Sequence, residues 1–297
     1  MRLPPAVIGV VTFSGMLGVL LFWGGLMLLP ATLLKALLLP FPATQRPLTR
    51  YMVWVGRRWA GGLRRVYRLC HGARWRIEDE TRGLRTDGSY LLVCNHQSWA
   101  DILILFELFH GRAPFLRFFL KQELMWVPII GAACWGMEMP FMKRHSREAI
   151  AANPALRNED LETTRRTCQR YRGEAITVVN FLEGTRYTPA KHAAKGSPFR
   201  HLLRPKSAGL SFTLNAMGDQ FDALIDVTLH YQPSRRPLLW SWLCGEQREL
   251  RVHLVTRPLP EALLRGNYED DPGFRARFQH WVNALWLEKD ARLAAWR

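Results

Sequence analysis

The longest apolar stretch of the chain comes first. No charged residue occurs from Ala6 to Leu29, and about 20 apolar residues are enough for a helix to cross a bilayer. Pro30 interrupts this stretch, and residues 31–39 continue it with only Lys35 inside. The continuation is too short to cross by itself, so it is expected to be a tilted extension, half of a re-entrant hairpin or an interfacial segment. Residues 1–40 are therefore predicted to be transmembrane or membrane-embedded.

A cleaved signal peptide is the alternative for this segment. Its apolar region is longer than signal peptides use, only Arg2 precedes it as a positive charge, and no clear small-residue cleavage site follows. An uncleaved anchor is therefore preferred. Positive residues cluster after the apolar segment, which predicts that the rest of the chain faces the cytoplasm from an inner or cytoplasmic membrane.

A basic amphipathic helix is predicted within residues 41–74, where Thr49 to Cys70 shows helical periodicity. Arginines fall on one face of this helix and apolar side chains roughly opposite: Arg50, Arg57, Arg58, Arg64, Arg65 and Arg68 against Tyr51, Val55, Trp59, Val66 and Leu69. Such a helix lies in the headgroup plane of a membrane. A soluble-domain helix with a solvated basic face is the alternative.

From about Trp75 onward, short β-type runs alternate with helical patterns. Strands are predicted at 90–94, 115–120, 176–182, 223–230 and 250–255, and helices at 101–108, 123–134, about 147–172, 208–217 and 274–296. This alternation predicts that residues 75–297 form one α/β domain, with a mixed or mainly parallel sheet flanked by helices. The tryptophan-rich stretch 237–243 suits either a membrane interface or burial under the sheet.

The positive charge of the chain predicts binding to phospholipid membranes. The chain has 41 Lys and Arg against 25 Asp and Glu, a formal net charge of +16, and no acidic residue precedes Glu78. An anionic phospholipid surface attracts such a block. Binding to nucleic acid is not expected, because no zinc-finger, aromatic RNA-binding or basic-helix motif accompanies the charge. Five scattered cysteines without a C-x-x-C pair predict reduced thiols.

Candidate chemistry begins with the polar stretch 95–101, NHQSWAD, between a predicted strand and a predicted helix. Ser98 and Asp101 fit a helix capping box, which leaves His96 unexplained. In α/β sheets ligands bind at the carboxyl ends of the strands, where His96 is expected to lie. Asp101 in the first helical turn could also reach back to His96 and fix the tautomer that accepts a proton.

Three further clusters follow predicted strands or precede a predicted helix. In 181–186, FLEGTR, Gly184 permits a tight turn or close ligand approach, and Arg186 presents a fork that matches a phosphate. A Glu–Arg surface turn is the alternative. The segment 141–144, FMKR, puts two cations after an apolar run. The segment 204–209, RPKSAG, precedes a helix whose N-terminus could bind an anion.

In this order and spacing the four clusters resemble the four blocks of the glycerolipid acyltransferase family, specifically lysophosphatidic acid acyltransferases, over roughly residues 85–232. The resemblance implies a membrane-bound enzyme of phospholipid biosynthesis. It would move a fatty acyl chain from acyl-CoA or acyl-carrier protein to the free sn-2 hydroxyl of lysophosphatidic acid. His96 would be the base and Asp101 would orient it. Residues implied to bind the acceptor are Arg144, Glu183, Gly184, Thr185 and Arg186, with Lys143 and Lys206 as further cationic candidates.

The resemblance also sets limits. No covalent acyl-enzyme is implied, and the chain has no G-x-S-x-G elbow. No metal and no cofactor beyond the acyl co-substrate is expected. Thr228 stands where many family members have a proline, so headgroup choice does not carry over. The alternatives are an acyltransferase for another lysophospholipid or a non-glycerolipid acceptor, and a non-catalytic basic lipid-binding membrane protein.

Overall fold

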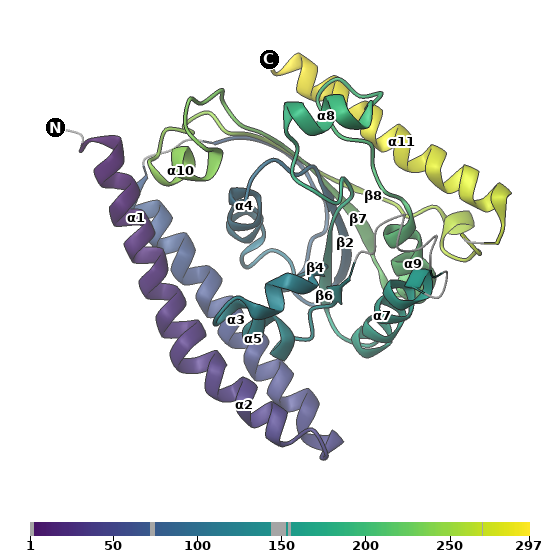
Figure 1. Cartoon of the computed structure of the whole chain (residues 1–297), viewed down its shortest axis with the longest axis horizontal. Helices are drawn as coiled ribbons and strands as arrows, with labels where there is room; N and C mark the ends of the chain where they lie inside the picture. The colour runs from purple at the N-terminus through teal and green to yellow at the C-terminus, as the bar shows by residue number, and fades with distance from the viewer. Residues whose placement is uncertain (1–2, 72–74, 144–152, 154–155, 269) are drawn as a thin grey trace.

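A six-stranded sheet forms the centre of the molecule (Figure 1). The computed structural model describes residues 3–71, 75–143, 153, 156–268 and 270–297. The strand order is β1-β8-β7-β2-β6-β3, and all neighbours are parallel except β7 and β8. The bounds are β1 Arg76–Glu80, β2 Ser89–Cys94, β3 Leu116–Phe118, β6 Ile176–Phe181, β7 Ala223–His230 and β8 Arg251–Arg257. The prediction of a mainly parallel α/β sheet is confirmed.

Helices cover both faces of this sheet, so the apolar run of β2 is buried on both sides. Tyr90, Leu92 and Cys94 pack in one core cluster with the helices on the left of Figure 1, and Leu91 and Val93 in a second cluster with those on the right. The first group comprises α1 (Pro5–Val19), α3 (Pro42–Cys70), α4 (Ala100–Phe109), α5 (Ile130–Gly136) and α10 (Leu238–Leu243). The second comprises α7 (Leu156–Tyr171), α9 (Ala208–Met217) and α11 (Pro272–Ala295).

The apolar N-terminal stretch is one continuous helix built from α1 (Pro5–Val19), a π-helical part (Leu20–Leu28) and α2 (Leu29–Leu37). Pro30 does not interrupt it. Proline has no N–H and its ring clashes with the carbonyl four residues earlier, and the wider π-helical turns directly before it relieve both problems. Within the described part of the chain this 33-residue helix is the one that is long and apolar enough to cross a membrane.

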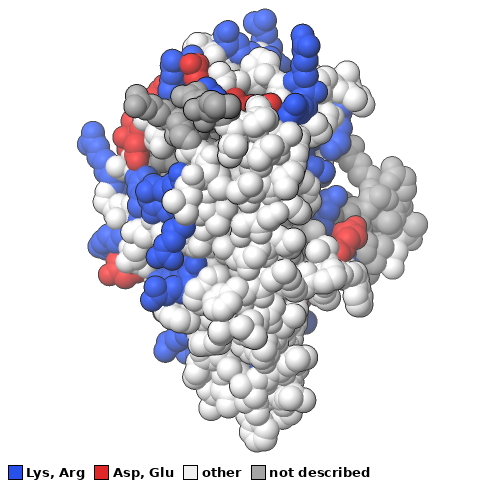
Figure 2. All heavy atoms as spheres, turned by 90° about the vertical axis from the view of Figure 1, so that its left-hand side faces the viewer, with Lys and Arg blue, Asp and Glu red and all other residues white. Residues whose placement is uncertain are grey.

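Helix α3 (Pro42–Cys70) runs back along this first helix. Glycines permit the close approach: a Cβ on Gly15 would lie 2.9 Å from Val66, and one on Gly62 would lie 2.8 Å from Val19. The outer face of the first helix exposes large apolar side chains, including Val10, Phe13, Leu21, Phe22, Leu26 and Leu33. Figure 2 shows an uncharged surface down this side, with Lys and Arg gathered along one flank. The helix predicted within 49–70 is confirmed; its headgroup-plane location stays a prediction.

Other predicted elements are corrected in detail. The helix predicted at 123–134 is broken into a 3₁₀ turn (Gln122–Trp126) and α5, because Pro128 intervenes and Ile129 adopts a φ of 64°. The strand predicted at 115–120 divides into β3 and β4 (Leu120–Lys121), and β4 pairs with β5 (Phe141–Met142). The tryptophan-rich stretch forms α10, and Trp242 is buried and stacks on Tyr67. Short helix α8 (Pro189–Lys195) and strands β1 and β5 were not predicted.

Candidate functional site

The loop that carries His96 leaves the middle of the sheet. β2 lies between β6 and β7, and its carboxyl end at Cys94 leads through residues 95–99 into α4. The side-chain amide of Asn95, fully buried, accepts the backbone N–H of Leu229 and donates to the carbonyl of the same residue, both at 2.9 Å. Gln97 donates to this carbonyl at 3.0 Å. Two side chains thus fasten the loop to β7 and hold His96 at the carboxyl edge.

His96 is held by a fully buried carboxylate. Its ring nitrogen Nδ1 lies 2.8 Å from Oδ2 of Asp101, and the same oxygen accepts the backbone N–H groups of Gln97 at 2.6 Å and Ser98 at 2.9 Å. A carboxylate acceptor assigns the proton to Nδ1, which leaves Nε2 with a lone pair. No residue in the described part of the chain hydrogen-bonds Nε2. The side chain is 15% exposed, so Nε2 is the atom available to a substrate proton.

Tyr231, just beyond the end of β7, completes this arrangement. Its hydroxyl donates to Oδ1 of Asp101 at 2.5 Å. Burial and the neighbouring Asp101 carboxylate raise the pKa of the Tyr231 hydroxyl, so the group stays protonated and remains a donor. Tyr231 was not predicted as a site residue. Its only signal was its position just after the strand next to β2.

The helix-cap interpretation of Ser98 is partly right. α4 begins at Ala100, and the Ser98 hydroxyl accepts the Ala100 N–H at 3.1 Å. The Asp101 carboxylate reaches back to the backbone of Ser98, which is the reciprocal half of a capping box. Asp101 therefore serves both the start of the helix and the orientation of His96.

Glu183 lies behind the His96 loop and is 1% exposed. One carboxylate oxygen accepts the backbone N–H of His96 and the other that of Leu203, each at 2.9 Å. Burial raises the pKa of the Glu183 carboxyl to about 7, against the opposing effect of the two backbone donors. These contacts favour a positioning role. Direct binding of an acceptor by Glu183 stays a prediction.

The 181–186 cluster lies against His96. The ring of Phe181 stacks on the imidazole with centroids 4.1 Å apart, and the N–H of Tyr187 donates to the His96 carbonyl at 2.7 Å. Gly184 has a φ of 66°, and a Cβ there would lie 3.2 Å from the Lys206 side chain. The positive φ favours glycine at this position, and a larger residue would also require the Lys206 side chain to shift slightly. The Lys206 side chain therefore lies beside this turn, and its role in binding the acceptor stays a prediction.

Cations surround this turn. The Arg186 guanidinium lies 5.3 Å above the ring of Trp99, and the ammonium of Lys191 donates to the Thr185 hydroxyl at 2.9 Å. Desolvation lowers the pKa of Lys191, and the positive charges of Arg186, Lys195 and Lys121 lower it further. Lys191 and Lys121 were not predicted as site residues. They extend a basic region that suits a phosphate.

The 141–144 cluster is only partly visible. Lys143 follows β5, whose partner β4 ends at Lys121, and Lys143 is exposed. Arg144 lies outside the described residues. Within the described residues no group of three or more His, Cys, Asp and Glu side chains could hold a metal ion. The expectation of a metal-free reaction stays a prediction.

Comparison with known proteins agrees with the resemblance. Residues 76–219 match the model of the family described as Acyltransferase. Similar proteins include human 1-acyl-sn-glycerol-3-phosphate acyltransferase gamma, 28% identical over 212 residues, and the mouse delta enzyme, 27% identical over 213 residues. Each alignment covers 68% of this chain and 51% of the relative, so the chain spans about half the length of these proteins.

A solved structure supports the fold. The crystal structure of the 1-acyl-sn-glycerophosphate (LPA) acyltransferase PlsC from Thermotoga maritima is similar with a TM-score of 0.50 and 15% identity. The similarity covers 94% of this chain and 95% of that one. This share is larger than the segment 76–219 matched by the family model.

Proposed function

We propose, from the premise that residues 76–219 are a domain of the acyltransferase family, that this protein transfers a fatty acyl chain to lysophosphatidic acid. The donor is an acyl thioester, acyl-CoA or acyl-carrier protein, and the product is phosphatidic acid. The observation that carries the proposal is the oriented imidazole: Nδ1 of His96 bound to buried Asp101, with Nε2 left for the substrate. The names of the relatives, all 1-acyl-sn-glycerol-3-phosphate acyltransferases, support the choice of acceptor.

The chemistry follows from this tautomer. Nε2 of His96 accepts the proton of the free sn-2 hydroxyl as the oxygen attacks the thioester carbonyl. The C–O bond forms, the C–S bond breaks, and the leaving thiolate takes the proton back from the imidazolium. Asp101 stabilises the imidazolium between these two transfers, and Tyr231 holds Asp101. General-base catalysis of this kind contributes about 10²–10⁴-fold.

The basic region beside His96 is the proposed site for the acceptor phosphate. Arg186, Lys206 and Lys191 lie around the Gly184–Thr185 turn, and Arg144 and Lys143 would add charge from the neighbouring segment. Glu183 acts by holding the backbones of His96 and Leu203. No cofactor other than the acyl donor takes part in this mechanism.

The apolar first helix supports a membrane location. Its exposed side chains need an apolar surrounding, and the acceptor itself is a membrane lipid. We place the acyltransferase domain on the cytoplasmic side of the membrane, because positive charge accumulates after the first helix.

The test is release of free thiol from acyl-CoA by the full chain in detergent micelles, with and without added acceptor. Release that requires lysophosphatidic acid, and that is lost in a folded His96→Ala variant, is expected. A panel with lysophosphatidylcholine, lysophosphatidylethanolamine and glycerol 3-phosphate identifies the acceptor. Release that is the same without any acceptor, or undiminished in His96→Ala, would contradict the proposal.

A further inference from the structure

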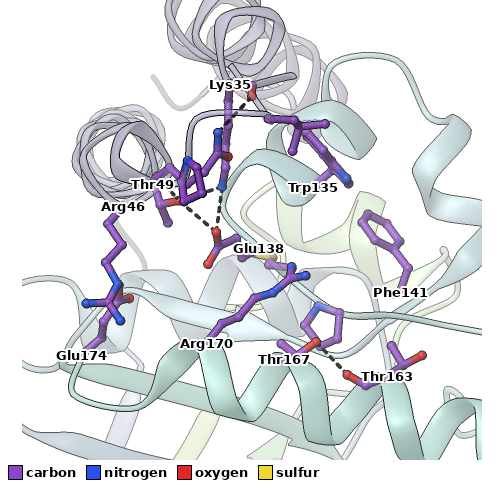
Figure 3. A pocket seen from close by; sticks show the side chains of 15 residues that line it. Lys35, Arg46, Thr49, Trp135, Glu138, Phe141, Thr163, Thr167, Arg170 and Glu174 are labelled. Atoms are coloured by element: carbon purple, nitrogen blue, oxygen red, sulfur yellow. Dashed lines mark hydrogen bonds and ion pairs between the residues drawn. The ribbon is translucent and has the colours of Figure 1, made fainter. Parts of the chain in front are cut away.

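A cavity of about 470 Å³ lies between the two N-terminal helices and the sheet, away from His96 (Figure 3). Ligand sites commonly have roughly 300–1,000 Å³. α2 and α3 form one wall, the segment between α5 and β5 a second, and α7 a third. Glu174 lies at the amino end of β6, whereas Phe181 lies at its carboxyl end against His96. At about 3.3 Å per residue, roughly 20 Å of strand separates the two sites.

Some of the charged side chains that line this cavity have ion-pair partners and others do not. Lys35, 3% exposed, donates to Thr49, to the Gly136 carbonyl and to Glu138, the last at 2.9 Å. Glu174 accepts from Arg117 at 3.0 Å. Both carboxylates that line the cavity therefore have a cation of their own. Figure 3 shows Arg170 pointing up into the cavity and Arg46 beside Glu174 at its edge.

Arg46 and Arg170 have no such match. Neither forms an ion pair or side-chain hydrogen bond with any residue in the described part of the chain. Both are exposed, and they face the cavity from different helices, α3 and α7. The lining holds three cations and two carboxylates. Because Lys35 pairs with Glu138 and Arg117, outside the lining, pairs with Glu174, the positive charges of Arg46 and Arg170 are left over. A phosphodiester carries one negative charge, and arginine presents two parallel donors to its oxygens.

The rim of the cavity is apolar where the two helices meet. Leu39 lines the cavity and is 55% exposed, so it joins the cavity to the outer surface. Leu37 beside it is 76% exposed and Phe41 is 59% exposed. Trp135 and Phe141 add apolar surface within the cavity. A ligand that carries both a phosphate and alkyl chains matches this combination.

We propose that this cavity binds the phosphate of an anionic membrane phospholipid, with Arg46 and Arg170 as its ligands and the acyl chains along the exposed tip formed by Leu37, Leu39 and Phe41. Phe141 belongs both to the cavity lining and to the 141–144 cluster, whereas His96, Asp101, Glu183 and Tyr231 do not line the cavity. Its occupant is a lipid of the surrounding membrane and undergoes no reaction there.

The experiment uses the full chain in detergent micelles and dioctanoyl phosphatidylglycerol as the probe, with binding measured by titration calorimetry. This lipid is neither acceptor nor product of the proposed reaction. The variant R46Q/R170Q removes both phosphate ligands. The matched control R82Q/R265Q removes the same charge from exposed positions that lie outside α3 and do not line the cavity. Binding is expected to weaken about tenfold or more in the first variant and to change by less than about twofold in the second.

Three further arms separate the sources of the phosphate and the two sites. Dioctanoyl phosphatidylcholine and glycerol 3-phosphate are each expected to bind more weakly than the probe, and His96→Ala is expected to bind the probe normally. If both double variants bound the probe equally weakly, general surface charge would explain the binding, and the proposed site would be overturned. Binding of glycerol 3-phosphate as tight as that of the probe would overturn the lipid assignment.

Discussion

Replacing Tyr231 with Phe tests how the structure supports His96. The substitution removes one oxygen and keeps the ring, so the packing around it is retained. Among the described residues Tyr231 is the one donor to Oδ1 of Asp101, whereas Oδ2 has three donors. A hydrogen bond to a buried charge contributes about 1.5–3 kcal/mol. We therefore expect a loss of about 2 kcal/mol in the free energy of unfolding.

Activity should fall as well, because Asp101 orients the base. If about 1–2 kcal/mol of this stabilisation is lost in the transition state, kcat/KM falls about 5- to 30-fold. A carboxylate with one donor fewer holds the Nδ1 proton of His96 more strongly. The acid limb of the kcat/KM profile should then move to higher pH. Thiol release from acyl-CoA, measured from pH 5 to 9, gives both quantities.

Tyr90→Phe is the matched control. Tyr90 is 3% exposed, and its hydroxyl accepts the Arg85 N–H at 2.9 Å at the opposite end of β2. It should lose stability without any change in the pH profile. If Tyr231→Phe kept the wild-type profile and lost no more activity than Tyr90→Phe, the positioning role of Tyr231 would be refuted.

Three further predictions concern other buried and charged groups. The Glu183 carboxyl binds a proton more tightly in the folded chain, because burial raises its pKa from 4.5 to about 7. The free energy of unfolding should therefore decline by on the order of 3 kcal/mol as the pH rises from about 4.5 to 7. In urea titrations Glu183→Gln should lack this decline, and an equal decline in the variant would exclude Glu183 as its source. Lys35→Met should lower the free energy of unfolding by about 3–5 kcal/mol, because it leaves Glu138 without its cation. The double variant with Glu138→Gln should recover part of that loss. Purely additive losses in thermal unfolding would argue against coupling between the two residues. Arg186→Ala should raise the KM for lysophosphatidic acid about tenfold or more while the KM for acyl-CoA stays unchanged, and an unchanged acceptor KM would remove its phosphate role.

The periodic parts of the fold were accessible from the sequence. The buried strands and the helices at 101–108, 208–217 and 274–296 lie within a few residues of their predicted bounds. Short continuous apolar runs mark strands that are buried on both faces, and a period of 3.6 marks helices. The first helix differs, since proline predicts a break, and the π-helical part that avoids it has no local signal. The break before α5 has a sequence signal in Pro128, whereas the positive φ of Ile129 is rare for a β-branched residue and has no such signal.

Some contacts of the candidate site could be predicted from the sequence, and others depend on the three-dimensional fold. Asp101 was expected to reach back to His96 because both belong to the stretch 95–101 at a helix start. The approach of Lys206 to Gly184 joins two separate clusters and was not predicted. Tyr231 is 130 residues from Asp101 along the chain. Its contact depends on the strand order, which places β7 next to β2. The burial of Glu183 likewise follows from three-dimensional packing and has no local signal.

The link between Lys35 and Glu138 bears on how the first helix and the α/β domain relate. Glu138 has a φ of 63° and lies three residues before β5, which opens the 141–144 cluster. Met16, Leu28 and Ala31 of the first helix belong to the same core cluster as Leu92 and Cys94. The first helix is thus part of the core of the domain and could not be exchanged freely for another helix. A foreign membrane span of equal length could hold the protein at the bilayer, but it would leave the interior of the domain without one of its walls.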